Sequence, residues 1–148
     1  MREWLVLIHI LAAMVWIGGG IYAMFQSHRA LTTGEGLGIV ISQEERAGRL
    51  LFGPAAAVVL ITGLANVMST PAWSFGQTFV WLSLTLVLVS GLIGGAFYGP
   101  VWKRMQSIHD DNPDDPTLTT LRRRVSLISR LDLVILLTVV VLMVTKPI

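Results

Sequence analysis

The sequence predicts an all-α, four-helix transmembrane bundle built from a single domain over residues 1–148. Hydrophobic residues make up 53% of the chain and charged residues 14%, against about 25% charged residues in a typical soluble domain. Four apolar segments, at about 4–26, 50–69, 78–99 and 131–146, approach the ~20 residues that a helix needs to cross a bilayer. Backbone inside a bilayer must satisfy its own hydrogen bonds, so these segments are expected to be helices in contact with lipid.

The first apolar segment is expected to be a permanent membrane helix rather than a secretory signal. Its start, Met1-Arg2-Glu3, is a poor basic leader, and the apolar run continues to Phe25 without a cleavage site. The chain has no cysteine, which excludes disulfides and thiolate metal ligands. The net charge of +2 is too small to indicate a nucleic-acid partner.

The positions of lysine and arginine predict the orientation in the membrane. The first and third connections between the apolar segments hold nine of the eleven basic residues, and only Arg2 and Lys146 lie elsewhere. Basic connections stay preferentially in the cytoplasm. The sequence therefore predicts a multi-pass protein of a bacterial inner membrane with both termini on the non-cytoplasmic side.

Local signals suggest where the helices start and bend. Ser42 with Glu45 reads as a capping box, so the second helix is expected to start near Ser42 after a turn at 32–36. Proline removes a backbone donor, so a kink is expected at Pro54, and Pro100 is expected to bend or end the third membrane helix. Asp115 is a suitable N-cap for a helix that runs into the short fourth segment.

Two further sequence patterns suggest what the helices contact, namely other helices and the membrane interface. The third helix carries Gly91, Gly95 and Gly99 at four-residue intervals, a spacing that lets another helix approach closely, either in the same chain or in another subunit. A homo-oligomer or a complex with other membrane subunits is therefore expected. Aromatic side chains near the outer membrane boundary fit an interfacial belt, namely Trp4, Trp73, Phe75 and Trp81.

Ionisable side chains at membrane depth are candidates for function, and His9 is the first of them. Three interpretations of His9 remain open. It is a neutral histidine bonded to Asn66 or a backbone carbonyl, an axial ligand of a haem, or a copper ligand together with Met68 or Met143. The residues expected to form the binding layer with His9 are Trp16, Asn66, Met68, Trp81 and Met143.

A haem bound by His9 needs a second ligand or leaves one position open. His28 and His109 lie towards the cytoplasmic side, too far away to serve the same iron. The remaining options are Met68, Met143, His9 of a second subunit, or no second ligand. Asp132, the second ionisable side chain at membrane depth, is expected to form an ion pair with Arg49, because a buried carboxylate must be paired or neutralised.

The chain resembles a bacterial four-helix integral-membrane family of unknown function. The resemblance rests on residues 9–13 and 15–19, which read HILAA and VWIGG, and on weaker pieces at 52–55, 73–76, 99–100, 129–133 and 143–147. That family is similar to the copper-resistance D proteins and, more distantly, to the HemJ-type protoporphyrinogen oxidases.

The distant resemblance implies haem b as a possible cofactor, because the HemJ-type enzymes bind haem b through a first-helix histidine that corresponds to His9. Those enzymes also use a lysine early in the third helix, where this chain has Val80-Trp81-Leu82-Ser83. The leading hypothesis is a membrane protein that binds haem b through His9. The alternatives are a non-catalytic accessory or assembly subunit of a larger membrane complex, and a copper-handling membrane protein.

Overall fold

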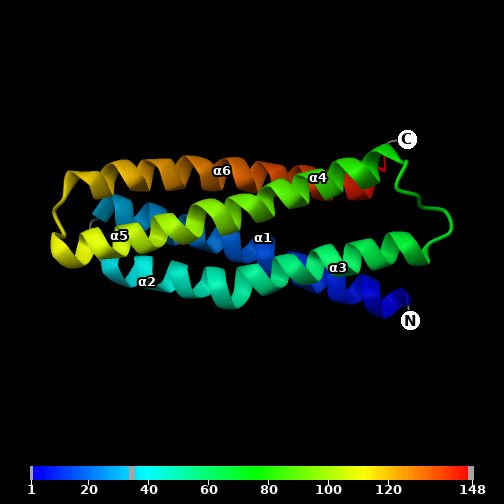
Figure 1. Cartoon of the computed structure of the whole chain (residues 1–148), viewed down its shortest axis with the longest axis horizontal. Coiled ribbons are helices and arrows are strands. Elements are labelled where there is room, and N and C mark those ends of the chain that lie inside the picture. Colours follow the sequence, from blue (N-terminus) through cyan, green and yellow to red (C-terminus); the bar gives the residue numbers. More distant parts are fainter. Residues whose placement is uncertain (1, 34–35, 147–148) are drawn as a thin grey trace.

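Four long helices that alternate in direction form the bundle (Figure 1). The computed structural model describes residues 2–33 and 36–146. Its elements in chain order are α1 (Arg2–Thr33), α2 (Leu37–Ala47), η1 (Gly48–Phe52), α3 (Gly53–Ser69), α4 (Thr78–Leu92), η2 (Ile93–Tyr98), α5 (Gly99–Asp111) and α6 (Pro116–Thr145). Within these residues, four helices are long and apolar enough to cross a membrane, which confirms the predicted fold class.

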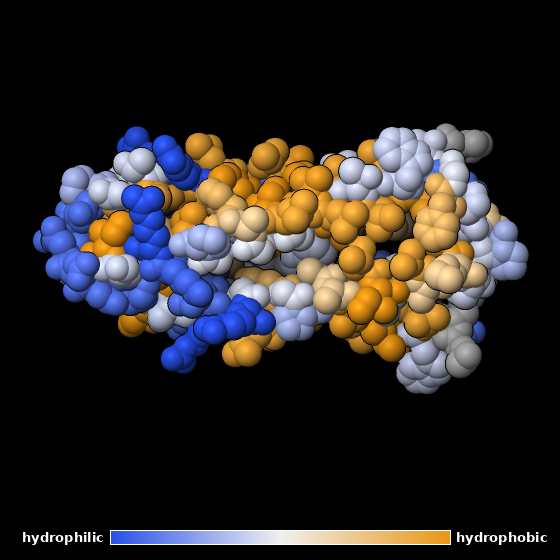
Figure 2. Space-filling view, viewed as in Figure 1, coloured by the Kyte–Doolittle hydropathy of each residue, from blue (hydrophilic) through white to orange (hydrophobic). Residues whose placement is uncertain are grey.

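The two ends of the bundle differ in polarity. One end holds both ends of the chain and the 70–77 loop, and we call it the terminal end (Figure 1). The opposite end, which we call the basic end, holds the α1–α2 and α5–α6 connections. Figure 2 shows hydrophobic side chains over the terminal part of the bundle and hydrophilic ones gathered at the basic end.

The helices are longer than the apolar segments from which they were predicted. The 32 residues of α1 span about 48 Å at 1.5 Å per residue, whereas the hydrocarbon core is about 30 Å thick. The first helix runs past residue 26 to Thr33, and the third runs past residue 99 to Asp111. Helix α6 starts at Pro116, as predicted from the N-cap at Asp115, and so begins well before the apolar segment at 131–146. The bundle therefore extends beyond the hydrocarbon, and its polar surface places the surplus at the basic end (Figure 2).

Helix α1 packs along α3 and α6, α4 packs on α6, and α2 packs on α5. Two clusters of buried side chains hold these contacts together. The mid-bundle cluster consists of Trp16, Ala55, Val59 and Leu136. The basic-end cluster consists of Ala30, Ile41, Trp102, Met105, Leu118, Leu121 and Val125. The part of the bundle outside the hydrocarbon thus has a core of its own.

Both glycine–proline pairs follow a π-helical stretch. Proline lacks an N–H and its ring clashes with the carbonyl four residues before it, so a widened turn relieves the crowding. Stretch η1 precedes Gly53 and Pro54, and Gly53 donates its N–H to the carbonyl of Gly48. Stretch η2 precedes Gly99 and Pro100 in the same way. The third membrane helix therefore continues through Pro100 into α5 and does not end there.

One predicted helix start is wrong and one is confirmed. Ser42 does not cap the second helix, because α2 begins at Leu37 and the Ser42 hydroxyl donates to the carbonyl of Ile39. Asp115 caps α6 by accepting a 2.7 Å hydrogen bond from the N–H of Thr117. Hydrogen bonds from the Thr117 side chain and backbone lower the pKa of the exposed Asp115 carboxyl. Residues 34 and 35 of the turn predicted at 32–36 lie outside the described residues.

The glycine face of the third membrane helix is open in the described part of the chain. A Cβ built at Gly91, Gly95 or Gly99 would meet no described atom within 4 Å, the surrounding helical backbone aside. Gly91 and Gly95 are exposed on the bundle surface. Close packing at this face stays a prediction, and within the described structure no helix of the same chain supplies it.

Candidate ligand site at His9

The imidazole of His9 is held in one orientation by Thr62 across the α1–α3 contact. The two atoms Nδ1 of His9 and Oγ1 of Thr62 lie 2.9 Å apart. The Thr62 hydroxyl donates its own proton to the carbonyl of Val58, at 2.6 Å. When the hydroxyl proton of Thr62 stays on this carbonyl, Nδ1 of His9 donates the 2.9 Å hydrogen bond and Nε2 is the unprotonated ring nitrogen.

The backbone of α3 makes room for this imidazole. A Cβ built at Gly63 would lie 3.2 Å from Cε1 of His9, tighter than most real contacts. Gly63 follows Thr62 directly, so the residue that binds Nδ1 and the residue that accommodates the ring are neighbours in sequence. Together they set the orientation of the imidazole ring.

The free side of His9 faces an apolar pocket between α3 and α4. The pocket encloses about 60 Å³, and about 470 Å³ when its open side is included. Figure 2 shows a hollow between α4 and α3 in the terminal half of the bundle, where the surrounding surface is hydrophobic. The pocket lining comprises His9, Val59, Leu60, Gly63, Leu64, Val67, Phe75, Val80, Ser83, Leu84, Val87, Val139 and Met143. The pocket therefore opens sideways towards lipid.

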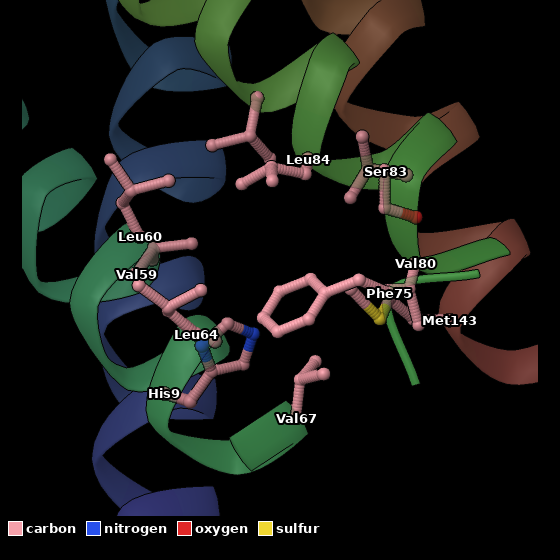
Figure 3. A pocket seen from close by; sticks show the side chains of 13 residues that line it. His9, Val59, Leu60, Leu64, Val67, Phe75, Val80, Ser83, Leu84 and Met143 are labelled. Carbon is pink, nitrogen blue, oxygen red and sulfur yellow. The ribbon is translucent and has the colours of Figure 1, made fainter. Parts of the chain in front are cut away.

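Phe75 lines the pocket on the side that faces the imidazole of His9 (Figure 3). It extends from the 70–77 loop into the pocket, and the second ring nitrogen of His9 points towards it (Figure 3). Met143 of α6 lines the pocket beyond the Phe75 ring (Figure 3). The prediction that Phe75 belongs to the interfacial belt therefore missed its place in the pocket, although the ring is still half exposed.

Only some of the residues that were predicted to form a binding layer with His9 lie at the pocket. His9 and Met143 line the pocket, and Asn66 is buried on α3, one helical turn beyond Thr62, with no hydrogen-bond partner for Oδ1 among the described residues. Trp16 belongs to the mid-bundle cluster instead. Met68 and Trp81 are 74% and 50% exposed and do not line the pocket.

Thr62 is the site residue that the sequence argument missed. His9 lies seven residues after the first residue of α1, and Thr62 lies seven residues before the last residue of α3. Antiparallel neighbours with equal offsets lie at equal depth, so this count selects Thr62 over Asn66. Within the described residues no group of three or more His, Cys, Asp or Glu side chains forms a metal site.

A comparison with models of known protein families shows the family to which the chain belongs. Residues 3–147 match the family described as a predicted integral membrane protein, DUF2269. The chain belongs to the DUF2269 family. Comparisons with curated proteins and with solved structures gave no match. The match covers all four membrane helices of this DUF2269 protein, the His9 pocket included.

The second ionisable group of this DUF2269 protein, Asp132, has a different partner from the one expected. Its Oδ1 accepts a hydrogen bond from the hydroxyl of Ser90, which is 1% exposed. Arg49 instead lies 3.5 Å from Glu45 on its own helix. Among the described residues no ion pair includes Asp132, so the structure does not show the expected pair with Arg49. A hydroxyl bond between α4 and α6 replaces it.

Proposed function

We propose that this DUF2269 protein binds haem b through Nε2 of His9. The observation that carries the proposal is the 2.9 Å contact between Nδ1 of His9 and Oγ1 of Thr62, because it turns the other ring nitrogen, Nε2, towards an apolar pocket. Haem-ligating and metal-ligating histidines are oriented in this manner by a partner at the other ring nitrogen. The distant resemblance to the HemJ-type oxidases supports the same residue.

The pocket offers haem a nitrogen donor at His9, but haem does not fit in the enclosed space while Phe75 lies across it. The enclosed volume of about 60 Å³ is smaller than the roughly 150 Å³ that holds one benzene molecule. Haem binding would therefore require the ring of Phe75, a half-exposed residue of the 70–77 loop, to leave the pocket. The open side between α3 and α4 gives a planar, lipid-soluble molecule a way in.

The chain's own residues would then act on the bound group in three ways. Thr62 holds His9 with its lone pair towards the pocket, Gly63 leaves room for the ring, and the aliphatic lining excludes water. Haem b bound there would supply one-electron redox chemistry. Burial in apolar surroundings is one of the features by which a protein sets the potential of such a group.

The test is an absorption spectrum of the purified protein reconstituted with haem b, recorded oxidised and then reduced with dithionite. We expect a Soret band that sharpens on reduction in the wild type and is lost in His9→Ala. His28→Ala is a matched control, because His28 lies 19 residues further along α1, about 28 Å away. A wild-type spectrum without a Soret band, or one that His9→Ala leaves unchanged, would refute the proposal.

Copper binding is a second candidate, favoured by one observation. Met143 supplies a soft thioether to the same pocket as His9, whereas Met68 lies outside it. A copper protein would show no Soret band, and Cu(I) would raise its melting temperature in a way that Met143→Leu abolishes. The open glycine face keeps the accessory-subunit role as a third candidate.

We further propose that the protein lies in a bacterial inner membrane with the terminal end outside the cytoplasm. Nine of the eleven basic residues lie in the first and third connections and their adjoining helices, towards the basic end. A reporter enzyme that is active only outside the cytoplasm is expected to be active when fused after Ile148 and inactive when inserted after Asn112. The reverse pattern would refute this orientation.

A further inference from the structure

We propose that Asp132 is a proton-binding site inside the bundle, and that its proton exchanges with the basic end by way of Tyr98 and Glu44. The proposal goes beyond the function proposed above and does not depend on any ligand at His9. It assigns a role to the second ionisable group at membrane depth, for which the described residues supply a hydroxyl partner and no ion pair.

The carboxyl group of Asp132 is held in the bundle by a neutral partner. The Asp132 side chain is half-buried, and its Oδ1 accepts a hydrogen bond from the hydroxyl of Ser90, which is 1% exposed. An ionised carboxylate that is removed from water without a counter-ion is costly, and such a group becomes neutral by binding a proton. This position therefore favours the protonated acid with one hydroxyl partner.

The helices that pack on α6 are α1, α4 and α5, and none of their described residues forms an ion pair with Asp132. Helix α4 contains no basic residue. The basic side chains on α5 and on α6 nearest to Asp132 are exposed, namely Lys103, Arg104 and Arg130.

The basic residues of α1 lie further towards the basic end than Asp132. Trp16 of α1 and Leu136 of α6 belong to the same cluster, and Asp132 lies four residues from Leu136 in the direction of the basic end. The histidine and arginine at 28–29 lie twelve and thirteen residues from Trp16 in that direction, about 12 Å further along the bundle than Asp132. A proton is therefore the cation that can neutralise Asp132 where it lies.

Tyr98 connects Asp132 with the basic end. Its ring packs against the basic-end cluster, and its hydroxyl oxygen is buried. This hydroxyl interacts electrostatically with the carboxyl groups of both Asp132 and Glu44. Ser129 faces it as well, but the Ser129 hydroxyl donates its own proton to a backbone carbonyl of α6. A phenol both donates and accepts, so Tyr98 can receive a proton from one carboxyl group and pass its own to the other.

Glu44 is the group that exchanges the proton with water at the basic end. It lies three residues after Ile41 on α2, and Ile41 is fully buried in the basic-end cluster, so Glu44 shares the inward side of this helix. Glu45, the next residue, pairs with Arg49, whereas no ion pair among the described residues includes Glu44. Helix α2 precedes the apolar segment at 50–69, which places Glu44 outside the hydrocarbon.

Apolar side chains close the opposite direction, from Asp132 towards the terminal end. Leu136 follows Asp132 by one helical turn and is buried in the mid-bundle cluster, whose other members are Trp16, Ala55 and Val59. None of these side chains both accepts and donates a proton. The site is therefore connected to one end of the bundle only.

Proton release breaks the O–H bond of the neutral Asp132 carboxyl group and gives the proton to the phenol oxygen of Tyr98, while the phenol O–H proton moves to the carboxylate of Glu44. Uptake is the reverse, and no electron is transferred. Release leaves a negative charge inside the membrane, so the occupancy of the site responds to the membrane potential as well as to pH.

The first test is infrared difference spectroscopy of the full-length protein in lipid vesicles, between acidic and alkaline buffer. We expect the carbonyl stretching band of a protonated carboxyl group, which disappears as the pH rises and is missing in Asp132→Asn. Asp114→Asn is the matched control, because Asp114 is exposed in the α5–α6 connection, and it is expected to keep the band.

A second variant assigns the band even if Asp132→Asn folds poorly. Ser90→Ala is expected to move the band to higher wavenumber, because the carboxyl group loses its hydroxyl partner. A wild type with no titrating carboxyl band, or a band that neither variant changes, overturns the proposal. Tyr98→Phe is expected to keep the band but slow its response to a step in pH, and an unchanged rate would exclude the route through Tyr98.

The side from which the proton enters is tested with dicyclohexylcarbodiimide, which dissolves in lipid and modifies protonated carboxyl groups. The protein is placed in sealed vesicles in a single orientation, and modification of Asp132 is measured by mass spectrometry. Raising the pH on the side of the basic end is expected to reduce modification several-fold, whereas raising it on the other side is expected to have no effect. Modification that follows the pH at the terminal end would overturn the route, and no modification at any pH would overturn the site.

Discussion

Thr62→Val is expected to weaken haem binding at His9 by about 10-fold to 100-fold, the usual effect of removing the group that orients a metal-binding histidine. Valine has nearly the shape of threonine but offers no oxygen to Nδ1 of His9, which lies 2.9 Å from Oγ1 in the wild type. Without that acceptor the imidazole can rotate or exchange tautomers. The dissociation constant is measured by titrating the apo-protein with haem b and following the Soret band.

The control for this prediction is Thr62→Ser, which retains the hydroxyl and its bond to Val58. It is expected to bind haem within a few-fold of the wild type. Thermal unfolding of both apo-variants separates an effect on the ligand from an effect on the fold, because one side-chain hydrogen bond between membrane helices contributes about 0.6 kcal/mol on average. If Thr62→Val bound haem as tightly as the wild type, Thr62 would not be what prepares His9.

The fold could be predicted from hydropathy because the bilayer admits few alternatives. Backbone in hydrocarbon must be helical or part of a closed barrel, so four apolar runs of sufficient length determine four helices. The residues at which the helices start and end were predicted less accurately from the sequence. Ser42 with Glu45 has the sequence of a capping box, yet α2 starts five residues earlier, after Gly36 with a φ of 69°. Ile41, which lies just before Ser42, is fully buried in the basic-end cluster, so the part of α2 ahead of the expected cap packs into the bundle.

The candidate site could be predicted from the sequence only as far as its central residue, His9. His9 was recognisable as an ionisable group at membrane depth, but depth alone does not say which face of a neighbouring helix points towards it. Asn66 and Thr62 lie one turn apart on the same buried face of α3, and the bond to His9 selects Thr62. Phe75 could not have been assigned to the pocket, because nothing in a loop sequence states where its side chain turns.

The partner of Asp132 was also mispredicted because depth in the membrane does not by itself identify the side chain that faces it. Arg49 was chosen because it carries a charge near the same depth. Ser90 lies 12 residues after the start of α4 and Asp132 lies 13 residues before the end of α6, so the two are level in the bundle. A hydroxyl is an inconspicuous partner in sequence, although it can satisfy a carboxyl group inside a helix bundle.

Met105→Ala is expected to lower the free energy of unfolding by about 2–5 kcal/mol, the range for truncating a large apolar side chain in a packed core. Met105 of α5 is 1% exposed and belongs to the basic-end cluster, together with Trp102. Because this part of the bundle extends beyond the hydrocarbon, its core is sealed against water rather than lipid. The truncation therefore loses both hydrophobic transfer energy and packing.

Met14→Ala is the matched control, because Met14 is 65% exposed on α1 and its side chain can be replaced there by lipid or detergent. It is expected to change stability by less than about 0.5 kcal/mol, as substitutions away from packed sites usually do. Thermal or denaturant unfolding in detergent micelles measures both variants. Equal losses for Met14→Ala and Met105→Ala would mean that the basic end is not a separate packed core. A selective loss in Met105→Ala would show that the helices outside the hydrocarbon stabilise the bundle that holds the His9 pocket.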